Sequence, residues 1–521
     1  MKVFSLNSAV LASLVLAGSA AAGPLDFLFG TPSLEEAWRY EAEGGETACE
    51  IVSYDADTRK VFVTNAADET VDVLDATDGT LLHQIDVGDV NSVSCYEGLV
   101  AIAVAAETGV RGKVILLNAE DYTVYSEPEA GYLPDMVTFT PNGKYVLVAN
   151  EGEPNDDYDI DPVGSVSIID VTDPADPEVF ETGFESFNSE EAALKAAGVR
   201  IFGPGASVAQ DIEPEYITVS ANSRTAYVSC QENNAIAVIS IPAKRVLSIN
   251  PLGFKDHSLP ENAMDASDDD NGTINIQPWP TKGMYMPDSI ASTQFFGFTL
   301  VASANEGDAR DYDGFAEEER IKDLVLDEDA FPDADELQED ENLGRLNVTT
   351  TLGDLDNDNE YEELYSFGAR SFSIWLLTPF GQTVQVYDSG SDFEEITAAQ
   401  VPDFFNSDDG DSDNFDNRSD AKGPEPEAID IGSDLGCTWA FIGLERVGGV
   451  MVYDITNPLN PSFVQYSRNL TDVAPEGIDF ISRSNSPFTE PAIVVAHEVS
   501  GTTTLFKIKR TGGLLSRLLN N

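Results

Sequence analysis

A short motif that recurs along the chain limits the fold more than any other feature of the sequence. Each copy has a proline or small residue, then an acidic residue, any residue, and an aliphatic residue that opens an apolar segment. The acidic positions are Glu50, Asp135, Glu215, Asp288, Glu427 and Glu476. A degenerate copy has Asn91 at this position. Recurrence of this kind is the signature of architectures built from repeated units.

Two further apolar segments follow most copies of the motif. The first ends in polar residues, as at 146–151, and the second alternates and closes on an aspartate, as at 165–170. Three short segments joined by turns form one antiparallel sheet, the unit of a propeller blade. Counting the degenerate copy, the repeats predict an all-β fold, a seven-bladed β-propeller of the YVTN or WD40 type, within residues 23–521.

The recurring acids predict a metal site. In a propeller the first strand of each blade lines the central channel, so these side chains are expected on one ring at the channel mouth. Gathered carboxylates raise one another's pKa unless a cation neutralises them, and oxygen-only sites suit calcium. The ring therefore indicates a calcium site. The alternative is that the acids cap loops or accept hydrogen bonds from backbone amides.

Ring closure and insertions complete the predicted domain. Residues 38–41 are expected to pair with 504–508 and so to close the ring. The spacing between motifs grows along the chain, which indicates long acidic loop insertions in a single propeller domain. The insertions are expected at about 151–202, 251–286, 307–363 and 388–425, with short helices at 189–195 and 315–324.

Two insertion loops are dense in carboxylates. Asp354, Asp356, Asp358 and Glu360 lie two residues apart, a spacing by which a tight loop turns successive oxygens onto one calcium ion. This loop lacks the central glycine and the distal glutamate of an EF-hand. The loop at 406–417 is denser but less regular, and a solvated acidic loop is the favoured interpretation there.

The N-terminus predicts export. Lys2, the apolar run at 10–17 and the small residues at 20–23 are typical of a signal peptide over residues 1–22. No later apolar run is long enough to span a membrane. The mature chain is therefore expected to be secreted, extracellular or held at the cell surface, with glycan acceptor sequences at Asn271, Asn347, Asn417 and Asn469.

Export also makes the cysteines candidates for disulfides. The chain has four, Cys49, Cys95, Cys230 and Cys437, for which three pairings are open. Cys49 with Cys95 is the favoured pair because both lie near strand starts in neighbouring repeats.

The charge balance selects the class of partner. With 28 basic and 93 acidic residues, the formal net charge is −65. Such a field repels nucleic acids and anionic membranes and attracts divalent cations or other positive partners. A saline habitat also favours acidic surfaces, and this explanation is compatible with cation binding.

Several longer motifs resemble a known family. The segments at 148–158, 211–217, 231–238, 304–312, 368–375 and 420–427 resemble those of choice-of-anchor I proteins, which include mesenchyme-specific cell-surface glycoproteins linked to biomineralisation. The resemblance covers nearly the whole mature chain. It implies a secreted or surface-held, calcium-linked propeller, with a mineral or a phosphorylated ligand as partner. The family usually has glycines in the 354–360 loop, where this chain has Asn357 and Asn359.

Bacterial relatives of that family are sometimes labelled alkaline phosphatases, so a calcium-dependent extracellular phosphoesterase is the alternative function. A paired-zinc phosphatase is not expected, because His83, His257 and His497 are scattered without ligand spacing. Arg310 and Arg370, from two of the family motifs, are the candidates for a phosphate clamp. Salt bridges within a carboxylate-rich surface are the favoured explanation for both, and binding is favoured over catalysis.

Overall fold

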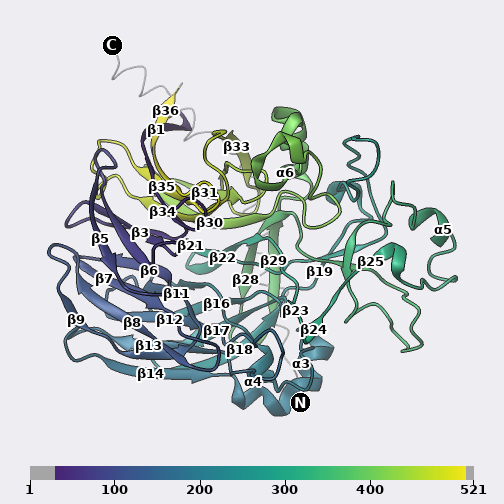
Figure 1. Ribbon diagram of the computed structural model, residues 1–521, viewed down its shortest axis with the longest axis horizontal. Helices are drawn as coiled ribbons and strands as arrows, with labels where there is room; N and C mark the ends of the chain where they lie inside the picture. The colour runs from purple at the N-terminus through teal and green to yellow at the C-terminus, as the bar shows by residue number, and fades with distance from the viewer. Residues whose placement is uncertain (1–29, 512–521) are drawn as a thin grey trace.

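The computed structural model describes residues 30–511 and is dominated by strands (Figure 1). The all-β prediction is therefore confirmed. The predicted signal peptide lies outside the described residues. Between residues 30 and 511, no helix has the length and apolar character needed to cross a bilayer.

Most strands belong to antiparallel sheets in which consecutive strands pair side by side. The first sheet contains β2 (Val52–Asp55), β3 (Lys60–Asn65), β4 (Thr70–Asp75) and β5 (Leu81–Asp86). The second contains β6 (Val90–Tyr96), β7 (Leu99–Val104), β8 (Arg111–Asn118) and β10 (Glu129–Tyr132), with β9 (Val124–Ser126) also on β8. Next come β11 (Pro134–Phe139), β12 (Tyr145–Asn150), β13 (Ser165–Asp170) and β14 (Glu178–Gly183). A further sheet holds β15 (Ile217–Val219), β16 (Thr225–Cys230), β17 (Ala235–Ser240) and β18 (Arg245–Pro251).

The C-terminal half repeats this arrangement. One sheet contains β21 (Ile290–Phe295), β22 (Phe298–Asn305), β28 (Ser371–Leu377) and β29 (Thr383–Asp388). Another contains β30 (Pro426–Asp434), β31 (Cys437–Leu444), β32 (Val450–Asp454) and β33 (Ser462–Ser467). The last contains β34 (Pro475–Ile481), β35 (Ala492–His497), β36 (Thr502–Thr511) and β1 (Thr31–Glu41).

The first strands of these sheets form a closed cycle, which is the arrangement of a β-propeller. In chain order β2, β6, β11, β15, β21, β30 and β34 each contact the next, and β34 contacts β2. Side chains link neighbours directly: the Cys95 amide donates to Ser53 Oγ at 3.0 Å, and the Tyr54 amide donates to Asp479 Oδ2 at 2.7 Å. Below the ring of acids, these strands line a cavity of 280 Å³.

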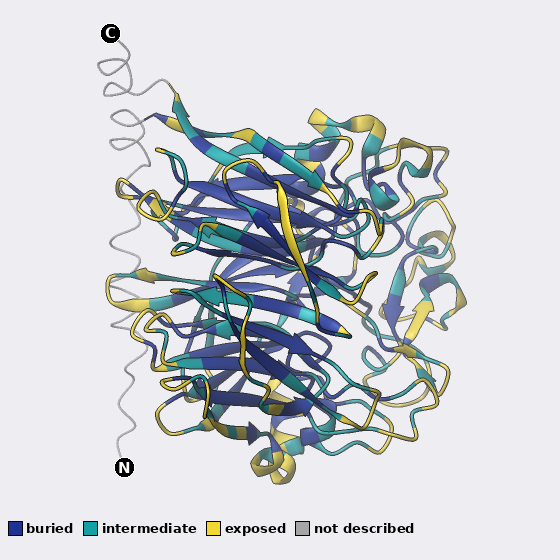
Figure 2. Cartoon of the chain, turned by 60° about the vertical axis from the view of Figure 1, so that its left-hand side comes forward, coloured by how far each residue is buried: buried dark blue, intermediate teal, exposed yellow. Residues whose placement is uncertain are grey.

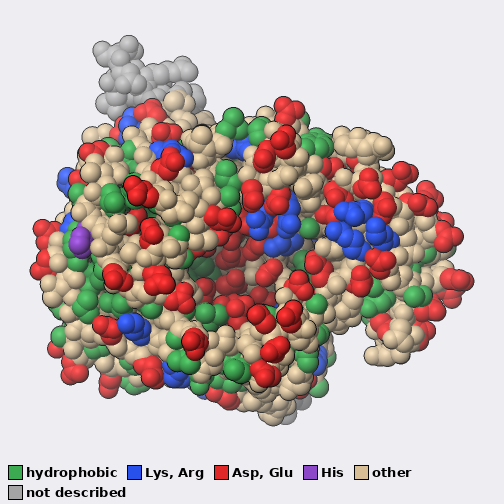
Figure 3. Space-filling view, viewed as in Figure 1, with side chains coloured by type: hydrophobic (Ala, Val, Ile, Leu, Met, Phe, Trp, Pro, Cys, Tyr) green, Lys and Arg blue, Asp and Glu red, His purple; other side chains and the backbone are tan. Residues whose placement is uncertain are grey.

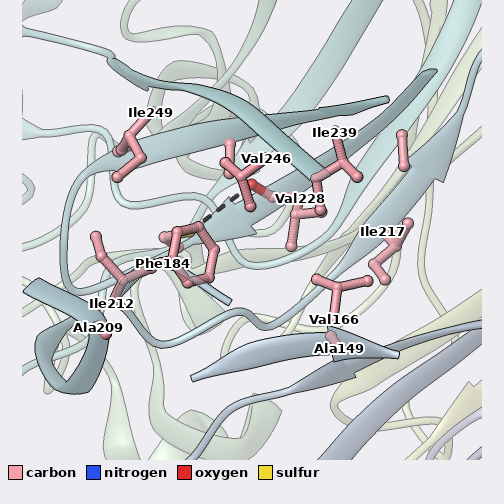
Figure 4. Packing of buried hydrophobic residues seen from close by; sticks show 14 of the residues in the cluster. Ala149, Val166, Phe184, Ala209, Ile212, Ile217, Val228, Ile239, Val246 and Ile249 are labelled. Atoms are coloured by element: carbon pink, nitrogen blue, oxygen red, sulfur yellow. Dashed lines mark hydrogen bonds between the residues drawn. The ribbon is translucent and has the colours of Figure 1, made fainter. Parts of the chain in front are cut away.

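The middle strands are apolar on both faces because they lie between neighbouring sheets. In β3, Val61 and Val63 pack with the last sheet, while Phe62 packs with the second sheet. The outermost strand β5 is largely exposed, as the yellow and teal outer edges in Figure 2 illustrate. Figure 4 shows one such inter-sheet core, where Val166, Val228 and Phe184 meet.

The predicted ring closure is confirmed. β1 pairs antiparallel with β36, and Arg39 lies opposite Thr504. Trp38 is 6% exposed, and its Nε1 donates to the Ala76 carbonyl at 2.8 Å. This contact joins the last sheet to the first, because Ala76 follows β4.

Two of the insertions pair with each other to form a lobe at the right of Figure 1. Its mixed sheet contains β19 (Phe254–Asp256), β20 (Lys282–Met284), β27 (Tyr365–Ser366), β26 (Asn347–Thr349) and β25 (Glu318–Arg320). The lobe has a hydrophobic core of its own, which includes Trp279, Phe331 and Leu343. Insertions that the sequence predicts as long acidic loops thus contain a packed unit.

The helices are short. Within residues 30–511 the α-helices are α3 (Glu191–Ala197), α4 (Val208–Asp211), α5 (Ala334–Leu337) and α6 (Asp392–Gln400). The helix predicted at 189–195 is confirmed as α3. The helix predicted at 315–324 is wrong: β24 (Phe315–Ala316) pairs with β23 (Asp311–Tyr312), and β25 pairs with β26, so sheet contacts override the local helix propensity.

The predicted disulfide is also wrong. Cys49, Cys95 and Cys230 are thiols in this structure. Cys49 precedes the leading end of β2, whereas Cys95 is the penultimate residue of β6, beside Ser53. The two cysteines therefore lie toward opposite ends of neighbouring innermost strands, which is why they do not meet.

Candidate functional site: a carboxylate ring at the channel mouth

The recurring acids all occupy the leading end of an innermost strand. Asp135, Glu427 and Glu476 are the second residues of β11, β30 and β34. Glu50, Glu215 and Asp288 lie two residues before β2, β15 and β21, and each of the six is partly buried. Figure 3 shows acidic side chains crowding into a hollow near the middle of the viewed face.

The carboxylates interact around the whole ring. Burial raises the pKa of Glu50 to about 8 and that of Asp135 to about 7, with neighbouring carboxylates adding to both. The pKa values of the other four members are raised well above their usual range for the same reasons. The interacting pairs are Glu50 with Asp135, Asp135 with Glu215, Glu215 with Asp288, Asp288 with Glu427, Glu427 with Glu476 and Glu476 with Glu50.

A second tier of acids, which the sequence reasoning did not select, surrounds the ring. These residues lie one residue after the second strand of a sheet, or two residues after it for Glu232: Glu151, Glu232, Glu306, Glu445 and Glu498. Their pKa values are raised, chiefly by burial. The signal was present, because the second apolar segment of each repeat ends in polar residues at this point.

Several ring oxygens lack a hydrogen-bond partner. Oε2 of Glu215, of Glu427 and of Glu476 is buried and unbonded within the described chain. Desolvating a carboxylate oxygen without a partner is unfavourable, so these atoms favour either a bound cation or a retained proton. The ring therefore offers carboxylate oxygens that could act as metal ligands and that no group of the described chain already bonds.

At the channel mouth, two groups of three carboxylates bring oxygens within 4.8 Å of one another, and both contain Glu306. The first consists of Asp288, Glu306 and Glu427, and the second of Glu306, Glu425 and Glu445. The second group is supplied with protein cations. Lys422 Nζ lies 2.7 Å from Glu306 Oε1 and 3.2 Å from Glu425 Oε2, and Arg446 bonds Glu445 at 2.8 Å.

These cations separate the two groups chemically. Lys422, Arg418 and Arg446 hold the pKa of Glu425 down at about 2, although burial opposes them. In the first group Lys422 reaches only Glu306, while Asp288 and Glu427 have no ion pair within residues 30–511. The first group is thus the better candidate for an added cation.

The two candidate arginines are buried in ion pairs. Arg310 is 2% exposed and contacts Asp211 Oδ1 at 2.7 Å and Glu213 Oε2 at 2.8 Å. Arg370 contacts Glu394 at 2.6 Å and donates to backbone carbonyls nearby. The geometry matches the salt-bridge interpretation, because both guanidinium groups are engaged by carboxylates of the protein.

The acidic loop at 354–360 brings part of its predicted set together. Carboxylate oxygens of Asp354, Asp356 and Asp358 lie within 4.8 Å of one another, and Glu360 is not in this group. Asp354 also accepts three backbone amides, from residues 357, 358 and 359. Asn357 and Asn359 adopt φ values of +64° and +71°, so asparagine meets the backbone demand that glycine usually meets.

Taken together, the fold and the ring define an acidic protein of the β-propeller class with a carboxylate-lined channel mouth. The sequence profile of the choice-of-anchor I domain matches residues 50–458, and the chain belongs to this family.

Two curated relatives are similar in sequence. Gigasin-3a of Magallana gigas is 32% identical over 194 residues, which cover 33% of this chain and 67% of the relative. The mesenchyme-specific cell surface glycoprotein of Strongylocentrotus purpuratus is 26% identical over 321 residues, which cover 53% of this chain and 40% of the relative. The chain thus spans less than half of the latter protein.

Solved structures are similar only loosely. Kuenenia stuttgartiensis hydrazine synthase has a TM-score of 0.46 at 10% identity, with coverage of 90% of this chain and 98% of the solved one. The Cps50 (Swd1) β-propeller domain of Myceliophthora thermophila has a TM-score of 0.44 at 8% identity, with coverage of 92% and 100%. Similarity at this level carries no information on function.

Proposed function

We propose that the chain is a calcium-binding β-propeller of seven blades that acts outside the cell or at its surface. The closed cycle of innermost strands supports the blade number. The choice-of-anchor domain and the cell-surface glycoprotein relative support the location. A net charge of −65 supports association with calcium-bearing partners, including mineral surfaces.

The group of Asp288, Glu306 and Glu427 carries the proposal. Calcium–oxygen distances are about 2.4 Å, so ligands on opposite sides of one ion are about 4.8 Å apart. The oxygens of this group satisfy that limit, and Glu427 Oε2 is buried without a partner. One ion here would offset charges that otherwise repel, and the remaining ring acids would supply a negative field around it.

The loop containing Asp354, Asp356 and Asp358 is proposed as a weaker second position. Its oxygens meet the same distance limit. However, Asp356 and Asp358 are exposed, and Asp354 already accepts backbone hydrogen bonds. Solvent competes with such a loop for the ion, so we expect the channel mouth to bind first.

The test is calcium titration by calorimetry together with elemental analysis of the purified protein. Glu427→Gln removes one charge without changing shape and should abolish the tightest binding event. Glu178→Gln, on the exposed outer strand β14, is the matched control and should bind like the wild type. A wild-type protein without calcium affinity, or a Glu427→Gln protein with unchanged affinity, would contradict the proposal.

A further inference from the structure

Two insertions meet at a buried cluster of polar side chains, here called the interior pocket, which shares no residue with the carboxylate ring. One contributes Asp265, and the other contributes Glu394 of α6 and Asp416. These three residues are 0%, 1% and 2% exposed. The Asp265 amide donates to Glu394 Oε2 at 2.8 Å, which joins the two insertions directly.

The pocket contains more negative charge than the protein neutralises. Arg370 Nη1 bonds Glu394 Oε1 at 2.6 Å and thereby balances one carboxylate. Arg370 Nη1 also bonds the Asp265 backbone carbonyl, but neither the Asp265 nor the Asp416 carboxylate forms an ion pair within residues 30–511. Burial, reinforced by the neighbouring carboxylates, raises the pKa of Asp416 to about 8 and that of Asp265 to about 7.

Oxygens in the pocket also lack donors. Asp416 Oδ1 accepts from Ser419 Oγ at 2.6 Å, but its Oδ2 is buried without a partner. Asn406 is fully buried, and its Nδ2 donates to Glu394 Oε1 at 3.2 Å and to Ser419 Oγ at 2.9 Å. Asn406 Oδ1 and Ser407 Oγ remain unbonded. The hydrogen bonds through Asn406 and Ser419 thus tie Asp416 to Glu394, which in turn holds Asp265.

Buried oxygens without donors are costly unless something positive approaches them. A carboxylate, an amide oxygen and a hydroxyl from one loop, beside a carboxylate from another, form an oxygen-only set of the kind that calcium prefers. We infer that this pocket is an interior site for a divalent cation, with Asp416 Oδ2, Asn406 Oδ1 and the Asp265 carboxylate as its ligands. The ion would fasten the 251–286 insertion to the 388–425 insertion, a role independent of the channel mouth.

The stoichiometric test uses a background in which the channel-mouth group is removed by Asp288→Asn and Glu427→Gln. In that protein, elemental analysis after equilibration with calcium should show one ion fewer when Asp416→Asn is added. Asp413→Asn, an exposed position in the same loop, is the matched control and should retain the ion. Asn keeps the shape of the side chain but removes the charge of the carboxylate. If the Asp416→Asn protein bound as many ions as its background, the inference would be overturned.

Hydrogen exchange on the unmodified chain provides an independent readout in case Asp416→Asn does not fold. Calcium at 100 times its dissociation constant should slow local opening by about 100-fold. We expect that protection in the backbone amides of 264–275 and 405–419. Unchanged exchange in both segments would overturn the inference. The calcium that is lost on introducing Asp288→Asn and Glu427→Gln tests the channel-mouth site instead. The two proposals can therefore fail separately.

Discussion

Glu427→Gln should change sign in its effect on stability when calcium is added. The carboxylate oxygens of Asp288, Glu306 and Glu427 lie within 4.8 Å of one another. At an effective dielectric constant of about 20, two ionised groups at that separation repel by about 3 kcal/mol. The pKa values of these groups are raised by burial and by one another, so retained protons relieve part of this repulsion, and we expect Glu427→Gln to stabilise the calcium-free protein by about 2 kcal/mol.

The calcium-bound protein should respond in the opposite direction. If the variant binds 100-fold more weakly, saturating calcium stabilises it by about 2.7 kcal/mol less than the wild type. For a chain of 521 residues, 1 kcal/mol corresponds to about 1 °C in the melting temperature. The variant should therefore melt about 2 °C higher than the wild type in chelator at pH 8 and lower in calcium.

The assay is thermal unfolding of the wild type, Glu427→Gln and Glu178→Gln in chelator and in calcium. The Glu178→Gln control should follow the wild type in both buffers. A Glu427→Gln shift of the same sign in both buffers would refute the reasoning, because the carboxylate would then act as an ordinary hydrogen-bonding group.

Three further predictions follow. The folded-state pKa of Glu50 is raised to about 8, so its ionisation destabilises the fold as pH rises from about 4.5 toward 8. In chelator, Glu50→Gln should therefore gain stability over the wild type between pH 5 and pH 8. A constant difference in the free energy of unfolding across this range would contradict the assignment. Trp38→Ala should cost about 3–5 kcal/mol in unfolding experiments, since it removes the buried contact that joins the last sheet to the first, and a loss below 1 kcal/mol would be inconsistent with this role. Arg310→Ala should destabilise the fold by about 3–5 kcal/mol, because it leaves Asp211 and Glu213 buried without their partner. A variant that folds well but has lost calcium-dependent hydrolysis of p-nitrophenyl phosphate would instead favour the phosphoesterase.

The comparison of Glu50→Gln with the wild type is needed because other groups also titrate. Burial lowers the pKa of His257 to about 3 and that of His497 to about 4. The unfolded chain binds protons at these positions below about pH 6.5, so both histidines destabilise the fold as pH falls. Their contribution is common to the two proteins and cancels in the difference.

The repeat made the ring predictable. Each acid keeps the same place relative to an apolar strand, so the symmetry of the fold brings the copies together without knowledge of any side-chain contact. Glu306 was harder to select, because its part in the site depends on the ends of two strands, β21 and β22, lying side by side. The sequence contains the polar strand endings, but only the paired sheet shows which of them face the channel.

The wrong predictions share a physical cause. Residues 315–324 have helix-forming side chains, yet Glu318–Arg320 gains more by pairing with Asn347–Thr349, which lies far along the chain. The 406–417 loop keeps Asp411 and Asp413 exposed, as a solvated loop should, but Asp416 is 2% exposed and lies near the charges of Asp265 and Asp270 in the 251–286 insertion. Local sequence does not reveal what another insertion packs against, so the lobe and its interior pocket required the structure.

The pairing of β1 with β36 has a mechanical consequence. Thr31 lies opposite Thr511, so the two ends of the described chain leave the last sheet from the same end of one antiparallel ladder. A pull applied between these ends loads the hydrogen bonds one after another, as in opening a zipper, and does not shear the ladder as a whole. A molecule tethered through one end and pulled through the other would open its ring at low force, before any of the other sheets is strained.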